Sequence, residues 1–213
     1  MLRLYDYVAS ANCLKARIAL AQLGIGYERV PVDIFAGETL TDEYAAINPQ
    51  RSTPVLQIDD GTYLMESNAI LHYLAEGTPL LADDALERAR LVRWLILEQT
   101  DVMPTFGGLR FRLATGRLKP DDPDAVRRRA AGEATLELLD AALRSADFLV
   151  GGRYTIADVA VYAYTHVAPE AGYELPPAVE RWVRRVEATP GFVNDLEPYP
   201  PNARAGAGRS VYD

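Results

Sequence analysis

The spacing of apolar and polar residues divides the chain into two regions with different patterns. In roughly the first 77 residues, short apolar runs with period-two alternation are separated by helical patterns. Strands are expected at 2–8, 27–34, 55–58 and 62–65, and helices at 13–23, 41–47 and 67–76. The order is β-α-β followed by α-β-β-α, which predicts an α/β domain.

The remainder of the chain shows helical periodicity without a convincing strand. A linker is expected at 78–85, followed by an all-helical domain at 86–197 with helices at 86–116, 125–145, 156–167 and 178–188. Pro104 or the Gly107-Gly108 pair is expected to kink the long first helix. The tail at 198–213 is rich in Pro, Gly, Ala and Arg, and is expected to be extended or disordered unless it packs across the body.

Composition narrows the possible partners. With 213 residues and 49% hydrophobic content, the chain can form two small domains that each bury a core. Its 30 acidic side chains against 22 basic ones favour neither nucleic acid nor an anionic membrane as a partner. No apolar run approaches the length of a membrane span and no signal peptide is visible, so we expect a cytoplasmic protein. The single cysteine, Cys13, excludes an internal disulfide and a multi-cysteine metal site, and no metal is expected.

Residues 48–70 form the most informative run of the sequence. Thr53-Pro54 can hold a strand edge open, and Asp60-Gly61 joins two apolar strands in a two-residue turn. Ser67 is expected to cap the next helix, whose free N–H groups and dipole favour a bound carboxylate. Together these features suit the binding of a small acidic peptide.

In order and spacing this run resembles the thiol-peptide site of the glutathione S-transferase superfamily, where Val-Pro or Thr-Pro precedes the strand and Glu-Ser follows it. The resemblance implies a thioredoxin-like, glutathione-binding domain at 1–77, an all-α C-terminal domain and a homodimer. It implies that Pro54 is cis, that the backbone of Val55 pairs with the cysteinyl unit of glutathione, and that Glu66 and Ser67 hold its γ-glutamyl end. Arg51, beside the strand entrance, either meets the glycine carboxylate or is a surface charge. The glutathione-binding residues expected from the sequence are thus Arg51, Thr53, Pro54, Val55, Glu66 and Ser67.

The chemistry is expected where the first strand meets the first helix. A thiol with a pKa near 8.5 is mostly protonated at neutral pH, so an enzyme that uses glutathione must stabilise the thiolate. Ser10 and Asn12 stand at the start of the helix, where their side chains could donate to sulfur. The segment from Ser10 resembles serine-type family members, but Ala11-Asn12 departs from the Ser-Cys of the zeta class and argues against a maleylacetoacetate isomerase. Asn12 therefore remains a rival to Ser10.

Other groups near this turn stay open as alternatives. Tyr5 or Tyr7 could place a phenol near the end of the first strand, as tyrosine-type members do, although the spacing to the helix differs by about one residue. Cys13 resembles the cysteine of mixed-disulfide members in position, yet a lone cysteine in a first helical turn is more often buried. His72 and His166 lie in helical patterns and are expected to have core or surface roles.

The second domain supplies candidates for an electrophile pocket and for a structural motif. The electrophile is expected between the domains against the long helix, with Met103, Thr105, Phe106 and Arg110 as its candidate contacts. Thr155-Ile156-Ala157-Asp158 is a capping box before an apolar run, so Asp158 is expected to be structural.

Three function classes follow. The leading one is a glutathione transferase that attacks a small electrophile with the thiolate. The second is a glutathione-dependent disulfide or peroxide reductase with the same fold, and the third is a non-catalytic binding or scaffold protein, since a fold does not fix an activity.

Overall fold

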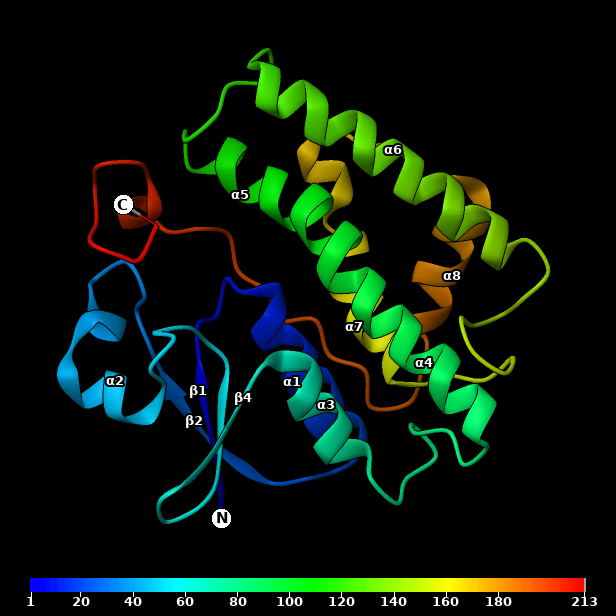
Figure 1. The fold of residues 1–213 in the computed structure, drawn as a ribbon, viewed down its shortest axis with the longest axis horizontal. Helices are drawn as coiled ribbons and strands as arrows, with labels where there is room; N and C mark the ends of the chain where they lie inside the picture. Colours follow the sequence, from blue (N-terminus) through cyan, green and yellow to red (C-terminus); the bar gives the residue numbers. More distant parts are fainter. Residues whose placement is uncertain (213) are drawn as a thin grey trace. The chain divides into compact units, whose positions relative to one another are not determined.

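The computed structural model describes residues 1–212 and divides into two compact units. The first unit comprises Met1–Leu74 together with the C-terminal segment that begins at Val193, and the second comprises Ala75–Phe192. The first unit is α/β and the second is helical, which confirms the predicted fold class (Figure 1). None of the helices within residues 1–212 has both the length and the apolar character needed to cross a membrane.

A four-stranded mixed sheet forms the centre of the first unit. Its strands are β1 (Leu2–Asp6), β2 (Tyr27–Pro31), β3 (Val55–Asp59) and β4 (Thr62–Met65), in the spatial order β2-β1-β3-β4. β1 and β2 are parallel, whereas β1 pairs with β3 and β3 with β4 in antiparallel fashion. Asp59 is opposite Thr62, so Asp60-Gly61 forms the predicted two-residue turn, with Gly61 at φ 88°.

Helices α1 (Ala11–Gln22) and α3 (Ser67–Ala75) lie beside the sheet, and α2 (Asp42–Ile47) lies on its other side in Figure 1. A short 3₁₀ turn, η1 (Glu38–Leu40), precedes α2. These elements match the expected ones within about two residues at most ends. The main difference is β2, which stops at Pro31 because the chain then turns into the loop that leads to η1.

The C-terminal segment, which the structure describes as far as residue 212, belongs to the first unit. It contains η4 (Pro201–Ala203), and Arg209 donates its backbone N–H to the carbonyl of Phe35 at 2.8 Å. The side chain of Asn202 donates to Asp33 at 2.9 Å. In Figure 1 this segment, drawn in red, ends near the loop that follows β2. The sequence alone left open whether this tail was extended, disordered or packed against the body; it is packed against the first unit.

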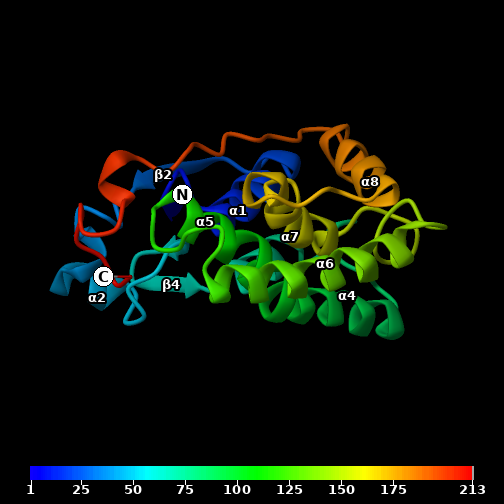
Figure 2. The same ribbon diagram turned by 90° about the horizontal axis from the view of Figure 1, so that it is seen from above.

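The regular elements of the second unit are helices. Its elements are α4 (Ala85–Leu97), η2 (Glu98–Gly107), α5 (Gly108–Ala114), α6 (Pro123–Leu143), α7 (Ile156–Thr165), η3 (Ala168–Ala171) and α8 (Pro177–Glu187). Every residue of α7 is buried, and this helix lies against α4, η2 and α8 inside the group of helices (Figure 2).

The long helix expected at 86–116 is divided by a change of winding. Between α4 and α5, η2 is π-helical and contains Pro104. Proline has no N–H to donate and its ring crowds the preceding turn, so a wider winding accommodates it without ending the helix. Gly107 is the last residue of η2. It must be glycine because a Cβ there would lie 2.3 Å from the ring of Tyr164.

The capping box of α7 is formed as predicted and is extended by two further donors. Thr155 and Asp158 cap each other, with the N–H of Thr155 donating to Asp158 at 3.0 Å. The same carboxylate accepts from the indole N–H of Trp182 at 2.9 Å and from the N–H of Leu149 at 3.0 Å. One buried carboxylate therefore joins α7, α8 and the loop before α7.

Candidate functional site

The turn between β1 and α1 presents Ser10 at the start of the helix. Ser10 has extended backbone angles (φ −90°, ψ 120°), and its Oγ accepts from the N–H of Cys13 at 3.3 Å, as an N-cap residue does. Its own N–H donates to the carbonyl of Tyr7 at 3.0 Å, which closes the turn. A serine hydroxyl carries one donor in addition to its acceptor lone pairs, so the cap leaves Ser10 able to donate to a ligand.

Asn12 and Lys15 on α1 meet the beginning of α3. The hydroxyl of Ser67 donates to Oδ1 of Asn12 at 3.0 Å. The ammonium of Lys15 donates to Oγ of Ser67 and to Oδ1 of Asn68, both at 3.3 Å. Lys15 is fully buried, whereas Asn12 and Asn68 are half-buried. We call these four residues the amide–lysine cluster; it places one cation beside two helix N-termini.

Glu66, just before α3, adopts a conformation that side chains usually avoid. Its φ is 68°, in the left-handed region, and its carbonyl accepts from the N–H of Ile70 at 2.9 Å. The side chain of Glu66 is exposed, whereas that of Ser67 is buried. Ser67 is the first residue of α3, and its hydroxyl turns to Asn12 and Lys15 where the sequence predicted a helix cap. Non-glycine residues held at positive φ cluster at functional sites.

The Thr53-Pro54 bond is cis, as the resemblance implies. Val55, however, lies in the interior of the sheet and pairs with Tyr5 on one side and Met65 on the other. Its N–H and C=O therefore point toward a strand of the protein itself, which conflicts with the expected pairing of Val55 with a ligand. Thr53 lies outside the strand, and within residues 1–212 its backbone forms no hydrogen bond with another backbone group.

Arg51 faces the protein. Its guanidinium donates to the carbonyls of Thr39 and Thr41 at 3.1 and 3.0 Å, and its backbone has a φ of 55°. These bonds hold the loop before β3 against η1, which favours a structural role over a contact with the glycine carboxylate. Buried Asn48 supports the same loop by donating to the carbonyl of Ser52 at 2.8 Å.

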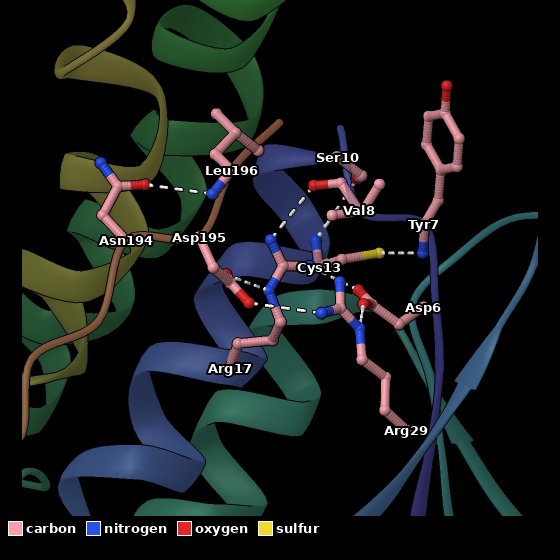
Figure 3. A network of polar contacts seen from close by, with 10 residues as sticks. All are labelled: Asp6, Tyr7, Val8, Ser10, Cys13, Arg17, Arg29, Asn194, Asp195 and Leu196. Carbon is pink, nitrogen blue, oxygen red and sulfur yellow. Dashed lines mark hydrogen bonds and ion pairs between the residues drawn. The ribbon is translucent and has the colours of Figure 1, made fainter. Parts of the chain in front are cut away.

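Cys13 is a buried core residue. Burial raises the pKa of its thiol to about 12, which outweighs the hydrogen bonds with Thr53, Tyr7 and Ser10 that favour the thiolate. The N–H of Tyr7 donates to its sulfur at 3.4 Å (Figure 3). A neutral buried thiol does not form a mixed disulfide readily, so the geometry argues against the cysteine-type alternative.

Neither tyrosine of β1 and its turn faces the start of α1 as an accessible phenol. The hydroxyl of Tyr5 lies 3.4 Å from Oε1 of Gln57 on the sheet, with its ring edge-on to Tyr44 and Tyr63. Tyr7 is buried beside Phe35, and burial raises the pKa of its hydroxyl far above the ordinary range. Ser10 and Asn12 are therefore the donors that the turn presents.

Most of the candidates for an electrophile pocket have structural roles in the second unit. Phe106 is fully buried edge-on to Tyr173, and the carbonyl of Thr105 accepts from the hydroxyl of Tyr173 at 3.3 Å. Arg110 is buried and forms an ion pair with Glu170 at 2.7 Å. Met103 is half-buried and remains available for a ligand contact.

Lys15 and Asn68 were not predicted as site residues. Lys15 is three residues after Asn12, so the two share one face of α1. That spacing was visible in the sequence, but the contact with Ser67 depends on the packing of α1 against α3. Asn68 follows Glu66-Ser67 directly in the sequence, and its contact with Lys15 is what identifies it as a site residue.

Comparison with known proteins identifies the family of the chain. Residues 9–76 match the glutathione S-transferase N-terminal domain, and residues 102–190 match the C-terminal domain. Maleylacetoacetate isomerase of Pseudomonas aeruginosa is 32% identical, with 90% of this chain and 93% of that protein covered. A crystal structure of a possible glutathione S-transferase from Rhodopseudomonas palustris is 40% identical, covers 92% of this chain and 90% of that one, and has a TM-score of 0.86.

A glutathione transferase family member from Pseudomonas fluorescens, solved with two glutathione bound, is 28% identical with a TM-score of 0.81 and covers 92% of each chain. These matches extend over both units. The chain belongs to the glutathione S-transferase superfamily.

Proposed function

We propose that the chain binds glutathione on its first unit and transfers the activated thiol to a small electrophile. The observation that carries this proposal is the convergence of two possible sulfur donors, Ser10 and Asn12, with the buried cation of Lys15. A chain with a net charge of −8 needs a local cation to hold an anionic tripeptide. The glutathione-bound relative from Pseudomonas fluorescens supports the same ligand.

The amide–lysine cluster suits the γ-glutamyl end of glutathione. This end carries an α-carboxylate and an α-ammonium group. The N-terminus of α3 and Lys15 favour the carboxylate, while the exposed carboxylate of Glu66 favours the ammonium. We assign the glutamyl end to Glu66, Ser67 and Lys15.

The cysteinyl unit is assigned to Thr53 in place of Val55. A peptide that extends from the amide–lysine cluster needs a backbone partner outside the sheet pairing, and Thr53 provides one next to Pro54. The hydroxyls of Thr53 and Ser10 both lie at Cys13, which places Thr53 beside the turn that presents Ser10. A thiol that follows this path reaches the start of α1.

Ser10 then stabilises the thiolate. Its O–H can turn from Cys13 to the ligand sulfur by rotation about one bond, while the N-terminus of α1 adds a smaller favourable term. The amide hydrogens of Asn12 provide a second donor, because only its Oδ1 is engaged by Ser67. The thiolate attacks the electrophile and a carbon–sulfur bond forms: an aryl halide loses its halide with the electron pair, whereas in an isothiocyanate the C=N π electrons move to nitrogen, which takes a proton from solvent.

A conjugation assay tests this proposal. The purified chain should conjugate glutathione to an aryl halide or an isothiocyanate. Ser10→Ala should lower kcat/KM by about tenfold or more, since the loss of one preorganised oxyanion donor costs on the order of 100-fold in kcat. Asp84→Ala is a matched control: Asp84 caps α4 of the second unit, so its replacement removes a similar helix cap without touching the Ser10 turn. Equal activity of Ser10→Ala and the wild type would contradict the assignment of Ser10.

A glutathione-dependent disulfide reductase is the second candidate. The half-buried Asn12 beside Ser10 favours it, and the neutral, buried Cys13 requires such an enzyme to work through bound thiols alone. Turnover of hydroxyethyl disulfide by the wild type, but no conjugation, would identify this activity. Calorimetry that detects no glutathione binding would leave a scaffold role.

We also propose a cytoplasmic homodimer. Val92 and Ile96, one turn apart on α4, are both exposed, and adjacent exposed apolar side chains often mark an interface. Sedimentation should give a dimer for the wild type and a shift toward monomer for Ile96→Glu. A monomeric wild type would contradict this proposal.

A further inference from the structure

The C-terminal segment contributes one carboxylate to a half-buried ring of charges beside the Ser10 turn. Asp195 of this segment accepts from Arg17 at 2.6 Å and from Arg29 at 3.3 Å. The same two arginines both donate to Asp6, with the Arg17 bond at 2.5 Å. Arg17, Asp6, Arg29 and Asp195 thus form a closed ring of alternating charges (Figure 3). Arg17 and Asp6 are buried, whereas Arg29 and Asp195 reach the surface.

Arg17 connects this ring to the turn that carries Ser10. Its three guanidinium nitrogens have three different acceptors: Nε donates to Asp195, Nη1 to Asp6, and Nη2 to the carbonyl of Val8 at 3.2 Å. The fixed fork of a guanidinium means that the two carboxylates together set the direction of the third bond. The position of the Val8 carbonyl therefore depends on Asp195.

The carbonyl of Val8 also accepts a hydrogen bond from the C-terminal segment itself. The N–H of Glu197, two residues after Asp195, lies 3.5 Å from it. Two residues further along the chain from Val8, Ser10 caps α1, and its N–H donates to the carbonyl of Tyr7. The C-terminal segment thus holds this turn both directly and through Arg17.

We propose that Arg17 and Asp195 are positioning residues for the thiol donor, so that the C-terminal segment is part of the apparatus that activates the thiol. This inference rests on the proposed function, because it assigns Ser10 as that donor. Loss of the negative charge of Asp195 weakens its bond to Nε of Arg17 and lets the guanidinium fork turn away from Val8. Ser10 then samples a wider range of positions and meets the sulfur less often. Binding of the glutamyl end does not depend on this ring, because Lys15 and Ser67 lie outside it.

Asp195→Asn tests the proposal with the full-length chain. Asp195 is on the surface, so the variant should fold; Asp195→Glu restores the carboxylate, and Glu28→Gln removes an exposed ion pair with Arg3 in the same unit as a control. Amide hydrogen exchange of Tyr7 and Ser10 in the free protein reports the turn without glutathione. We expect exchange on the order of tenfold faster in Asp195→Asn, a partial return in Asp195→Glu, and no change in Glu28→Gln.

Conjugation kinetics then test the link to the thiol. For Asp195→Asn we expect kcat to fall on the order of tenfold with KM for glutathione nearly unchanged, since a small misplacement of a donor affects the rate more than binding. If Tyr7 and Ser10 of Asp195→Asn exchange at the wild-type rate, or if its kcat is unchanged while the wild type is active, the inference is overturned and the proposed function stands. A wild type that neither binds nor conjugates glutathione would overturn the proposed function and this link together, and the exchange data would then report a structural tie alone.

Discussion

The hydroxyl of Ser67, at the start of α3, donates to Oδ1 of Asn12, at the start of α1, over 3.0 Å. This single bond joins the N-termini of two helices that lie 55 positions apart in the sequence. Lys15 donates to the same hydroxyl, so a cation stands where both helix dipoles are positive. This concentration of positive charge favours the binding of an anion beside it.

Lys15→Met should weaken glutathione binding while leaving the fold intact. The variant keeps an unbranched side chain in the buried position but removes the ammonium that we assign to the glutamyl carboxylate. Lys15 is fully buried and already donates to Ser67 and Asn68, so its charge acts on the carboxylate from behind Ser67. A loss of about 2 kcal/mol corresponds to roughly a thirtyfold higher Kd. Isothermal titration calorimetry measures this change, and Lys119→Met, at the only other lysine of the chain and on the surface, is the control. Equal affinities for the two variants would remove Lys15 from the site.

Cys13 should resist modification in the folded protein. Burial raises the pKa of its thiol to about 12, so almost no thiolate is present at pH 8. A thiol-reactive disulfide reagent should label the native chain slowly and the urea-unfolded chain within seconds. Cys13→Ala should retain conjugation activity within about twofold, since the loss is one of core packing. Rapid labelling of the native protein, with loss of activity, would instead indicate a cysteine-type enzyme.

The first unit was predicted largely from sequence because its signals are local. Alternation of apolar residues predicted the strands, Asp60-Gly61 the hairpin turn, and the order of elements the fold class. The role of Val55 was harder to predict because a run of residues does not reveal which side of a strand is already paired. The roles of Lys15 and Asp195 were not predicted for a related reason. Their partners Ser67 and Arg17 lie 52 and 178 positions away in the sequence, and only tertiary packing brings them together.

Asp158 should make stability depend on pH in an unusual direction. Burial raises the pKa of its carboxyl to about 6, and the four hydrogen bonds that the carboxylate accepts only partly offset this. The folded state therefore holds the proton more tightly than the unfolded state. The stabilisation due to this proton is complete below about pH 4 and is lost as the pH rises to about 6.

Asp158→Asn removes this titration and keeps one acceptor oxygen. The difference in unfolding free energy between the wild type and this variant should shrink, by on the order of 2 kcal/mol, as the pH rises from about 4 to about 6.5. Urea unfolding at several pH values measures it. A difference that is constant over this window would show that the carboxylate is already ionised at pH 4.

Gly107→Ala and Gly108→Ala should have opposite effects on stability. A Cβ at Gly107 would lie 2.3 Å from the buried ring of Tyr164, whereas one at Gly108 would meet the flexible end of Arg112 at 3.3 Å. We expect Gly107→Ala to lose about 2 kcal/mol through overpacking, and Gly108→Ala to gain up to about 1 kcal/mol from helix propensity. Thermal unfolding of the two variants tests this pair. Equal melting temperatures would contradict the close packing of η2 against α7.

The ultraviolet absorbance of bound glutathione as a function of pH tests the central claim most directly, because it reports the thiolate itself. With the wild type, the pKa of the bound thiol should fall well below its free value of about 8.5, so that a thiolate band is present at neutral pH. With Ser10→Ala, this band should appear only at higher pH while glutathione remains bound through Lys15 and Ser67. A wild-type complex without thiolate at neutral pH, or an unchanged titration in Ser10→Ala, would contradict the account.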